Sequence, residues 1–323
     1  RGWRKLSSMG EEGGGGEGGA MAEDRDWSEM TSECLTSVFS RLSLEDRWKG
    51  VMRVCRSWRD AARDPSLFSS FDLEPSFEAA GGGLSDASAW WTPEFKRRVD
   101  SMLHSAAQWS GGSLVQIRVR HCSDLSLSFT AERSPNLQIL CVRSSQSVTD
   151  SSMAKIALFC PMLRELDISH CYEISFESLE LIGRACPNIT VLKRNLLNWL
   201  DPSQHTGIVP AEYLNACPQD GDREAAAIGK FMPNLKHLEV QFSKLTIHGL
   251  TLISGGCGGL ECLDLFGCAN LTSRAIEQAT SNLKNLKTLK KPNFYIPRSV
   301  FHTERYGHWR LYDERFQTNI FQI

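Results

Sequence analysis

The chain has 323 residues, of which 41% are hydrophobic and 23% are charged, and its net charge at pH 7 is −2. These values are ordinary for a globular protein, and a charge this close to zero points to neither nucleic acid nor a membrane surface as a partner. No apolar run approaches the roughly 18 residues that span a bilayer. The length predicts about two domains.

Residues 1–25 form a leader that is rich in Gly and Glu and contains the run Gly13–Gly16. It lacks the apolar core of a signal peptide, and its composition predicts disorder. The chain does not begin with Met, which leaves a start of translation at Met9, a start at Met21, or a fragment of a longer sequence as interpretations.

Residues 26–71 have the pattern of three short helices. Ser28 or Thr31 can cap the first helix, and Ser43 can cap the second. A domain of about 45 residues buries too little surface to be stable alone, so we expect a partner that covers part of its apolar face. The apolar residues with helical spacing are Leu35, Val38, Phe39 and Leu42 in the first helix and Val54, Trp58 and Ala61 in the third.

Residues 72–110 are predicted to be a linker and a cap helix. Gly81–Gly83 indicate a loop or hinge, and Thr92 with Pro93 starts a helix that we expect to cover the first repeat. Trp90 and Trp91 either pack at the domain junction or contact a target. The apolar face of the helix consists of Phe95, Val99, Met102, Leu103 and Ala106.

Residues 111–291 repeat the pattern L-x-x-L-x-L-x-x-C/S, as in P-M-L-R-E-L-D-I-S-H-C at 161–171. The copies start 23 to 26 residues apart, except for one interval of 46 residues. A fixed period in this range with this pattern is the signature of leucine-rich repeats. The first apolar residues of the copies are Leu114, Leu137, Leu163, Ile189, Leu235, Leu260 and Leu286.

Each repeat combines a strand with a helix. Leu166 and Ile168 alternate with polar residues, as in a strand with one buried face, and residues 175–187 have helical spacing. Stacked copies bury their apolar faces together. We therefore predict an α/β fold of the repeat type: the three-helix domain, then a curved solenoid with parallel strands on its concave side and helices on its convex side. Nearly complete burial is predicted for Leu166, Ile168, Leu238, Val240, Leu263 and Leu265.

Two segments depart from the repeat. An insert at about 199–222 accounts for the long interval and is either a binding loop or a packed loop. Residues 292–323 are rich in aromatic residues. They form either a cap on the last repeat or a tail that binds a target.

The outward strand positions carry charges that are sorted along the array. Basic residues lie in the first two copies and acidic residues in later ones, with Lys193 as the exception. A surface of this kind suits a protein partner of complementary charge, and scattered solvated charge is the alternative. The candidate target-binding residues, expected on one exposed surface, are Arg118, Arg120, Arg143, Asp167, Glu239 and Asp264.

The eleven Cys residues favour neither disulfides nor a metal site. Their number is odd, and no C-x-x-C pair occurs. No H-E-x-x-H, G-x-S-x-G or P-loop motif is present either, so we expect no catalytic residue, metal or cofactor. Reduced thiols fit the nucleus or cytoplasm. The Cys residues that recur at repeat positions typical of small core residues are Cys122, Cys171 and Cys268, and Cys160, Cys186 and Cys257.

The first domain resembles the F-box. The resemblance rests on M-T-S-E-C-L at 30–35, V-C-R-S-W at 54–58 and D-P-S-L-F at 64–68, although the F-box pattern has Leu-Pro where this chain has Met30-Thr31. With its Cys-containing repeats, the chain resembles the plant Skp-interacting group of F-box/leucine-rich-repeat proteins. Further motifs of that group are W-W-T-P-E-F at 90–95, A-C-P-Q-D-G-D at 216–222 and T-E-R-Y-G-H-W at 303–309.

This resemblance implies the non-catalytic substrate receptor of a Skp–cullin–F-box ubiquitin ligase. Its F-box would dock on the Skp adaptor, and through it on cullin and RING subunits, while the repeats would hold a protein target. A small-molecule sensor and an interaction scaffold outside any ligase are the alternatives. We expect Met30 and Leu35 at the adaptor interface, and Trp58 either there or in the domain's own core. The adaptor contacts carried over by position are Met30, Thr31, Leu35, Val38, Leu42, Val54, Trp58 and Leu67.

Overall fold

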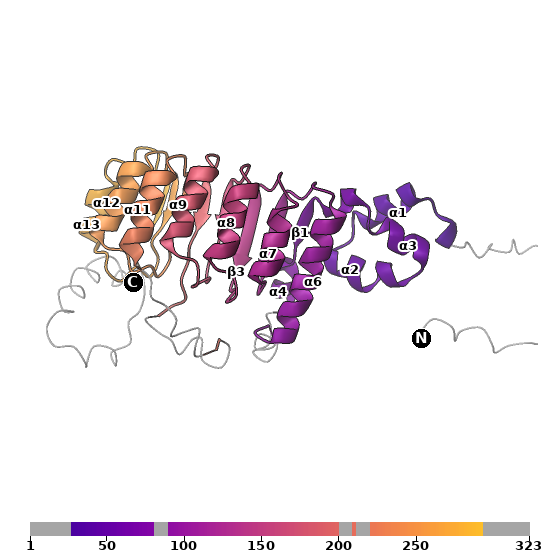
Figure 1. Ribbon diagram of the computed structural model, residues 1–323. Coiled ribbons are helices and arrows are strands. Elements are labelled where there is room, and N and C mark those ends of the chain that lie inside the picture. The colour runs from indigo at the N-terminus through magenta and orange to yellow at the C-terminus, as the bar shows by residue number, and fades with distance from the viewer. Residues whose placement is uncertain (1–26, 81–89, 200–208, 211–219, 293–323) are drawn as a thin grey trace, which may run out of the picture.

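The computed structural model describes residues 27–80, 90–199, 209–210 and 220–292. A small helical domain lies at one end, and a layer of helices over a layer of strands forms the rest (Figure 1). No described helix is long and apolar enough to cross a membrane. The leader, Gly81–Gly83, most of the insert and residues 293–323 lie outside the described part of the chain.

The strands form one parallel sheet in which each strand pairs with the next one in the sequence. One repeat advances the chain by one strand, so Leu140, Leu166 and Leu192 lie in register across three neighbours. This confirms the predicted α/β repeat fold. Within the described residues the strands are β1 (Ser70–Asp72), β2 (Gln116–Arg120), β3 (Ile139–Arg143), β4 (Glu165–Asp167), β5 (Val191–Lys193), β6 (His237–Glu239), β7 (Cys262–Asp264) and β8 (Thr288–Lys290).

The sheet begins earlier than the repeat pattern predicts. Strand β1 follows the helical domain directly and pairs with β2, with Phe71 beside Ile117. The helix α6 (Pro93–Trp109) precedes β2 in the chain, starts after the predicted cap Thr92 and packs against α7. It therefore belongs to the helix layer (Figure 1). Strand β1 has only three residues and lacks the L-x-x-L-x-L pattern, so the sequence gives no signal for it.

Neighbouring helices are tied together at their N-termini. The Asp124 carboxylate accepts hydrogen bonds from the backbone N and the hydroxyl of Thr149 at 2.8 and 2.6 Å, and Asp222 does the same for Thr246. Each bond satisfies a donor at a helix start and fixes one repeat against the next. The repeat helices are α7 (Asp124–Ala131), α8 (Asp150–Phe159), α9 (Phe176–Ala185), α11 (Gly221–Phe231), α12 (Ile247–Gly256) and α13 (Ser273–Thr280).

The core follows the alternation in the sequence. The six aliphatic strand residues predicted to be buried are all at most 4% exposed, which confirms the inward face of the strands. The recurrent Cys residues are buried too. Five of the six thiols donate to backbone oxygens of the preceding repeat, as from Cys171 to Val142 at 3.3 Å and from Cys268 to Val240 at 3.1 Å, whereas the Cys122 thiol lies 3.8 Å from the Ser145 hydroxyl.

The N-terminal helical domain, residues 27–68, packs on the array through aromatic rings. Trp109 at the end of α6 lies 5.2 Å from Trp48 and 5.4 Å from Phe68, measured between ring centroids. Thr31 and Ser43 cap their helices as predicted. The elements of this domain are η1 (Trp27–Glu29), α1 (Ser32–Phe39), α2 (Leu44–Lys49), η2 (Val51–Arg53), α3 (Arg56–Ala61) and η3 (Pro65–Phe68), and α4 (Glu74–Ala80) follows β1.

Candidate functional site

The N-terminal helical domain presents three large apolar side chains to solvent. Trp27, Val38 and Val54 are 63%, 50% and 58% exposed. Val38 lies on α1, and the other two lie in the segments next to α1 and α3. These three side chains are candidates for contact with a partner, because a partner that covers them removes apolar surface from water.

Four of the other predicted contacts lie around these side chains in the sequence. Thr31 is exposed, whereas Met30, Leu42 and Trp58 are partly buried against the core. The Trp58 indole donates to the Trp27 carbonyl at 2.9 Å, and its ring lies 5.3 Å from that of Phe39. Trp58 therefore contributes mainly to the domain's own core, which was one of its two interpretations.

Leu35 and Leu67, two of the predicted adaptor contacts, are buried inside the domain. Leu35 is 2% exposed and Leu67 is 6% exposed, so their side chains have almost no surface to offer a partner. Both fill the centre of a domain too small to bury its apolar residues elsewhere. The sequence pattern also missed Trp27, which stands before the first apolar stripe and so lies outside its helical spacing.

The basic residues of the first strands are bound to acidic neighbours. Arg120 pairs with Glu74 at 2.6 Å, Arg143 pairs with Asp167 at 2.7 Å, and Arg118 pairs with Glu165 at 3.4 Å. Glu74 comes from α4, outside the repeats. The positive charge at this end of the strand face is therefore balanced, because α4 and β4 supply the opposite charges.

The later strands repeat this arrangement. Glu239 lies 3.0 Å from the Lys193 Nζ and 2.8 Å from the His237 imidazole. Burial would raise the pKa of Glu239, but hydrogen bonds from His237, Asn195 and Lys193 lower it to about 2. Asp264 pairs with Lys290 at 2.9 Å and accepts from Gln241 at 2.9 Å.

Two of the predicted outward acids are in fact buried. Asp167 and Asp264 are both 1% exposed, and each also accepts the backbone N–H two residues later. They do lie on the strand face, but their neighbours cover them. The alternation of a strand assigns a side chain to a face, and it cannot say whether ion pairs then enclose it. The strand face is therefore a network of paired charges, with little free charge to attract a target.

A second surface lies at the edge of the sheet where the strands end. At the same place in four repeats the backbone is left-handed at a non-glycine residue: His121, Ser144, His170 and Phe242. In the next copy this residue is Gly267, where a Cβ atom would meet the Phe242 ring at 2.3 Å. The recurring turn brings one side chain from each of these repeats to this edge.

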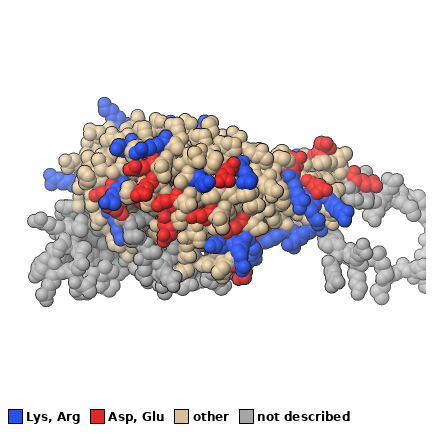
Figure 2. Space-filling model, in the orientation of Figure 1, with Lys and Arg blue, Asp and Glu red and all other residues tan. Residues whose placement is uncertain are grey.

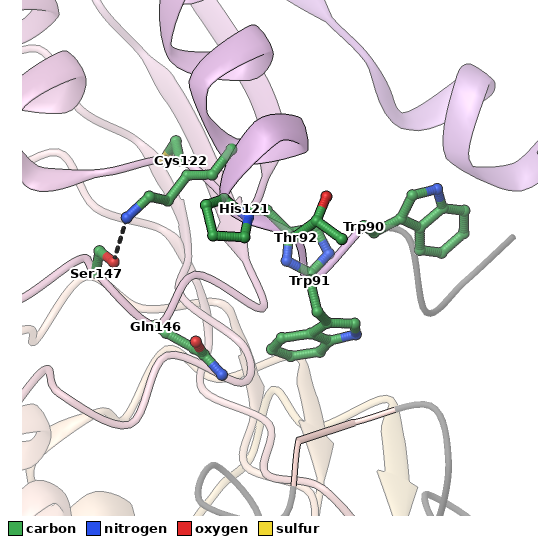
Figure 3. A pocket seen from close by; sticks show the side chains of 9 residues that line it. Trp90, Trp91, Thr92, His121, Cys122, Gln146 and Ser147 are labelled. Carbon is green, nitrogen blue, oxygen red and sulfur yellow. Dashed lines mark hydrogen bonds between the residues drawn. The ribbon is translucent and has the colours of Figure 1, made fainter.

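An open hollow lies at this edge between the start of α6 and the ends of β2 and β3 (Figure 3). The rings of Trp91 and His121 are 4.7 Å apart between centroids, and Lys96 Nζ donates to the Ser147 hydroxyl at 2.9 Å. Burial, with a smaller effect from Arg120, lowers the pKa of His121 to about 3. The imidazole is therefore neutral at pH 7.

The comparisons with known proteins bear on both parts of the chain. An F-box-like family model matches residues 32–74. The chain is 55% identical over 306 residues to F-box protein SKIP1 of Arabidopsis thaliana, an alignment that covers 94% of this chain and 100% of the relative. The chain belongs to the F-box/leucine-rich-repeat family. F-box/LRR-repeat protein 19 of the same plant is 48% identical, over 88% of this chain and 93% of that protein.

A solved structure resembles this F-box/leucine-rich-repeat chain only weakly. It is that of the yeast Rad7 and Elc1 complex, with a TM-score of 0.38 and 15% identity over 80% of this chain and 66% of that one. The F-box match ends at Glu74, just after β1 of the sheet. This residue pairs with Arg120 and, at 3.5 Å, with Arg143, so an ion-pair cluster joins the F-box region to the repeats.

The described part of this F-box/leucine-rich-repeat chain holds no group of three His, Cys, Asp or Glu side chains placed to bind a metal ion. Its recurrent thiols are poor nucleophiles, because burial raises the pKa of Cys160, Cys171, Cys257 and Cys268 to about 12.

Proposed function

We propose that this protein is the substrate-recognition subunit of a Skp–cullin–F-box ubiquitin ligase. The observation that carries the proposal is the exposure of Trp27, Val38 and Val54 on an F-box packed against a repeat array. A small domain leaves such side chains in water at a cost of about 25 cal/mol per Å2 of apolar surface. A partner that covers them recovers this free energy.

The adaptor surface proposed here differs from the one carried over by position. Trp27, Val38 and Val54 form its apolar centre, and Met30 and Thr31 lie next to Trp27 in the chain. Leu35 and Leu67 are buried in the core of the domain and Trp58 packs against it, so we assign them to the support of the fold.

The repeats supply the surface for a protein target. In this arrangement the chain performs no chemistry: it holds a lysine of the target near a ubiquitin carrier that the cullin and RING subunits bring. Fixing two reactants near one another converts a bimolecular step into a nearly unimolecular one. The rigid sheet between F-box and last repeat suits this role, since it fixes the distance between the two bound partners.

Co-purification with a Skp adaptor tests the proposal. We expect the Val38→Glu/Val54→Glu double variant to lose the adaptor, because a charge in an apolar contact must give up its water. The matched control is Leu125→Glu on α7, a residue that is 85% exposed and far from the F-box in sequence. Adaptor binding by the double variant at the wild-type level would refute the proposed docking surface, and failure of the wild-type chain to bind any Skp adaptor would refute the proposed function.

A further inference from the structure

The F-box carries a cluster of arginines next to one of its exposed apolar side chains. Residues 51–63 contain four arginines and a single acid, Asp60. Val54, which is 58% exposed, stands between Arg53 and Arg56 in this segment. Figure 2 shows Lys and Arg side chains on the lower side of the helical domain, where α2 and α3 lie in Figure 1. We call Arg53, Arg56 and Arg59 the arginine group.

The arginine group gathers at the junction of η2 and α3. Arg56 and Arg59 are three residues apart on α3, so their side chains leave the same side of the helix. Arg59 Nε donates to the Met52 carbonyl at 3.0 Å, which brings its guanidinium back to η2, beside Arg53. All three arginines are exposed. A partner that touches Val54 therefore meets guanidinium groups around it.

The arginine group differs from the cations of the strand face in its lack of carboxylate partners. No member of the group forms an ion pair with a carboxylate among the described residues, not even with Asp60 of the same segment. On the strand face, by contrast, Arg120, Arg143 and Lys193 each lie within 3.0 Å of a carboxylate oxygen. A ligand of the strand face has to displace existing ion pairs, whereas the arginine group is free to form new ones.

A partner that covers Val54 also covers part of the arginine group. A specific interface buries about 800 Å2 on each partner, far more than one valine side chain exposes, so Arg53 and Arg56 come within it. A guanidinium that loses its water without gaining acceptors is costly to bury. Carboxylates are the acceptors that fit best, because the guanidinium N–H groups match two carboxylate oxygens. We therefore expect the partner to bring acidic side chains.

We propose that the Skp adaptor carries an acidic segment that binds the arginine group while its apolar residues cover Val54. Carboxylates of that segment accept paired hydrogen bonds from Arg53 and Arg56. Arg59 keeps its Nε bond to Met52 and offers its two Nη atoms. Charges of this kind raise the association rate more than the affinity, because they steer the encounter. This inference rests on the proposed function, since it names the chemistry of the adaptor at the proposed docking surface.

Association kinetics of the full chain with a purified Skp adaptor test the inference. Arg53→Glu/Arg56→Glu should slow association about tenfold in about 50 mM NaCl. The difference should shrink to about twofold in about 500 mM NaCl, because salt screens exposed charges beyond a few Å. Arg53→Gln/Arg56→Gln should give an intermediate rate, because it removes the charges without reversing them. Arg59 is left unchanged in these variants, since its bond to Met52 also supports the fold.

The matched control is Arg164→Glu/Arg274→Glu, which changes the net charge equally at two exposed residues of the repeats. Its association rate should stay within about twofold of the wild type at either salt concentration. Thermal melting of all variants should match the wild type, because exposed substitutions outside ion pairs have little effect on stability. Equal association rates for the control and for Arg53→Glu/Arg56→Glu would overturn the inference.

Modification by phenylglyoxal, read by mass spectrometry, locates the contact on the wild-type chain. Arg53 and Arg56 should react readily in the free chain, whereas Arg47, which is 8% exposed, should react slowly. Bound adaptor should protect Arg53 and Arg56 and leave Arg164 reactive. Slow reaction of Arg53 and Arg56 in the free chain would assign them to the chain's own acids, such as those of the leader, and would also overturn the inference.

The two proposals fail in different ways. Capture of the adaptor by the wild-type chain, together with an association rate that does not respond to charge reversal, would leave the proposed function standing without the acidic segment. A wild-type chain that captures no Skp adaptor would refute both proposals.

Discussion

Arg194 and Glu224 form an ion pair in the core of the repeat array, with the guanidinium Nη2 3.1 Å from the carboxylate Oε1 and side chains only 1% and 9% exposed. Arg194 stands where Ile168 and Val240 stand in other copies. It also donates to the carbonyl oxygens of Cys171 and Ile174 at 2.6 and 2.7 Å. Because Glu224 lies on α11, just after the insert, this pair joins the two ends of the irregular copy.

Removing Glu224 alone should strongly destabilise the protein. Glu224→Ala leaves a buried guanidinium without its counter-charge, which costs about 3–5 kcal/mol in such cases. The double variant Arg194→Leu/Glu224→Leu should recover part of this loss, because it also removes the charge, but it still leaves the two carbonyl oxygens without a donor. Thermal unfolding followed by circular dichroism measures the difference. If the Glu224→Ala protein melted at the same temperature as the wild type, the ion pair would contribute nothing to stability.

Substitutions of Leu35 and Val38 should have different effects on stability, although the two residues lie one turn apart on α1. Leu35→Ala removes a buried side chain and should cost about 2–5 kcal/mol of stability, so adaptor binding is lost together with the fold of the domain. Val38→Asp alters an exposed position and should leave thermal melting unchanged while adaptor binding is lost. Limited proteolysis and adaptor pull-down on the same samples separate the two effects. Loss of stability in Val38→Asp would contradict the assignment of Val38 to the free surface.

The repeat period allowed much of this fold to be predicted. Leu166 and Ile168 alternate with polar residues, and alternation reports directly on which side of a strand is buried. Thr31, Ser43 and Thr92 were identified as caps because the cap needs only local sequence. These features depend on residues a few positions apart, so the sequence alone contains them.

Features that depend on residues far apart in sequence were not predictable. Glu74 pairs with Arg120 across 46 positions, and no local pattern links them. The burial of Asp167 arises from the same kind of contact, because Arg143 of the neighbouring strand covers it. The ion pairs of Arg118, Lys193 and Lys290 along the strands are contacts of the same kind. Likewise, the hollow at Trp91 exists only because α6 and the end of β3 meet there.

His121 should make stability depend on pH between about 3 and 6.5. Its pKa is lowered from 6.5 to about 3 by burial, so the unfolded chain takes up a proton first as the pH falls. Stability is therefore complete above pH 6.5 and is lost as the pH falls toward 3, by about 1.4 kcal/mol per unit.

The variant His121→Asn isolates this effect. Asn tolerates the left-handed backbone at this position, where φ is 57°. The loss of unfolding free energy between pH 7 and pH 5 should shrink by about 2 kcal/mol in the variant. Urea unfolding at the two pH values measures it, and His248→Asn on the exposed side of α12 is the control. An unchanged pH dependence in His121→Asn would mean that folding does not lower the pKa of the imidazole.

The Cys residues should react with a thiol reagent at rates that depend on how deeply each side chain is buried. Cys34 is exposed and Cys55 is half-buried, whereas Cys171 and Cys268 are fully buried. Burial raises the pKa of these last two thiols to about 12, and the thiolate is the reactive form. Iodoacetamide at pH 8 should therefore modify Cys34 first and leave Cys171 and Cys268 unmodified until urea unfolds the array. Mass spectrometry of tryptic peptides reports each site. Modification of Cys171 in the native protein at the rate of Cys34 would show that the repeats open far more readily than this packing allows.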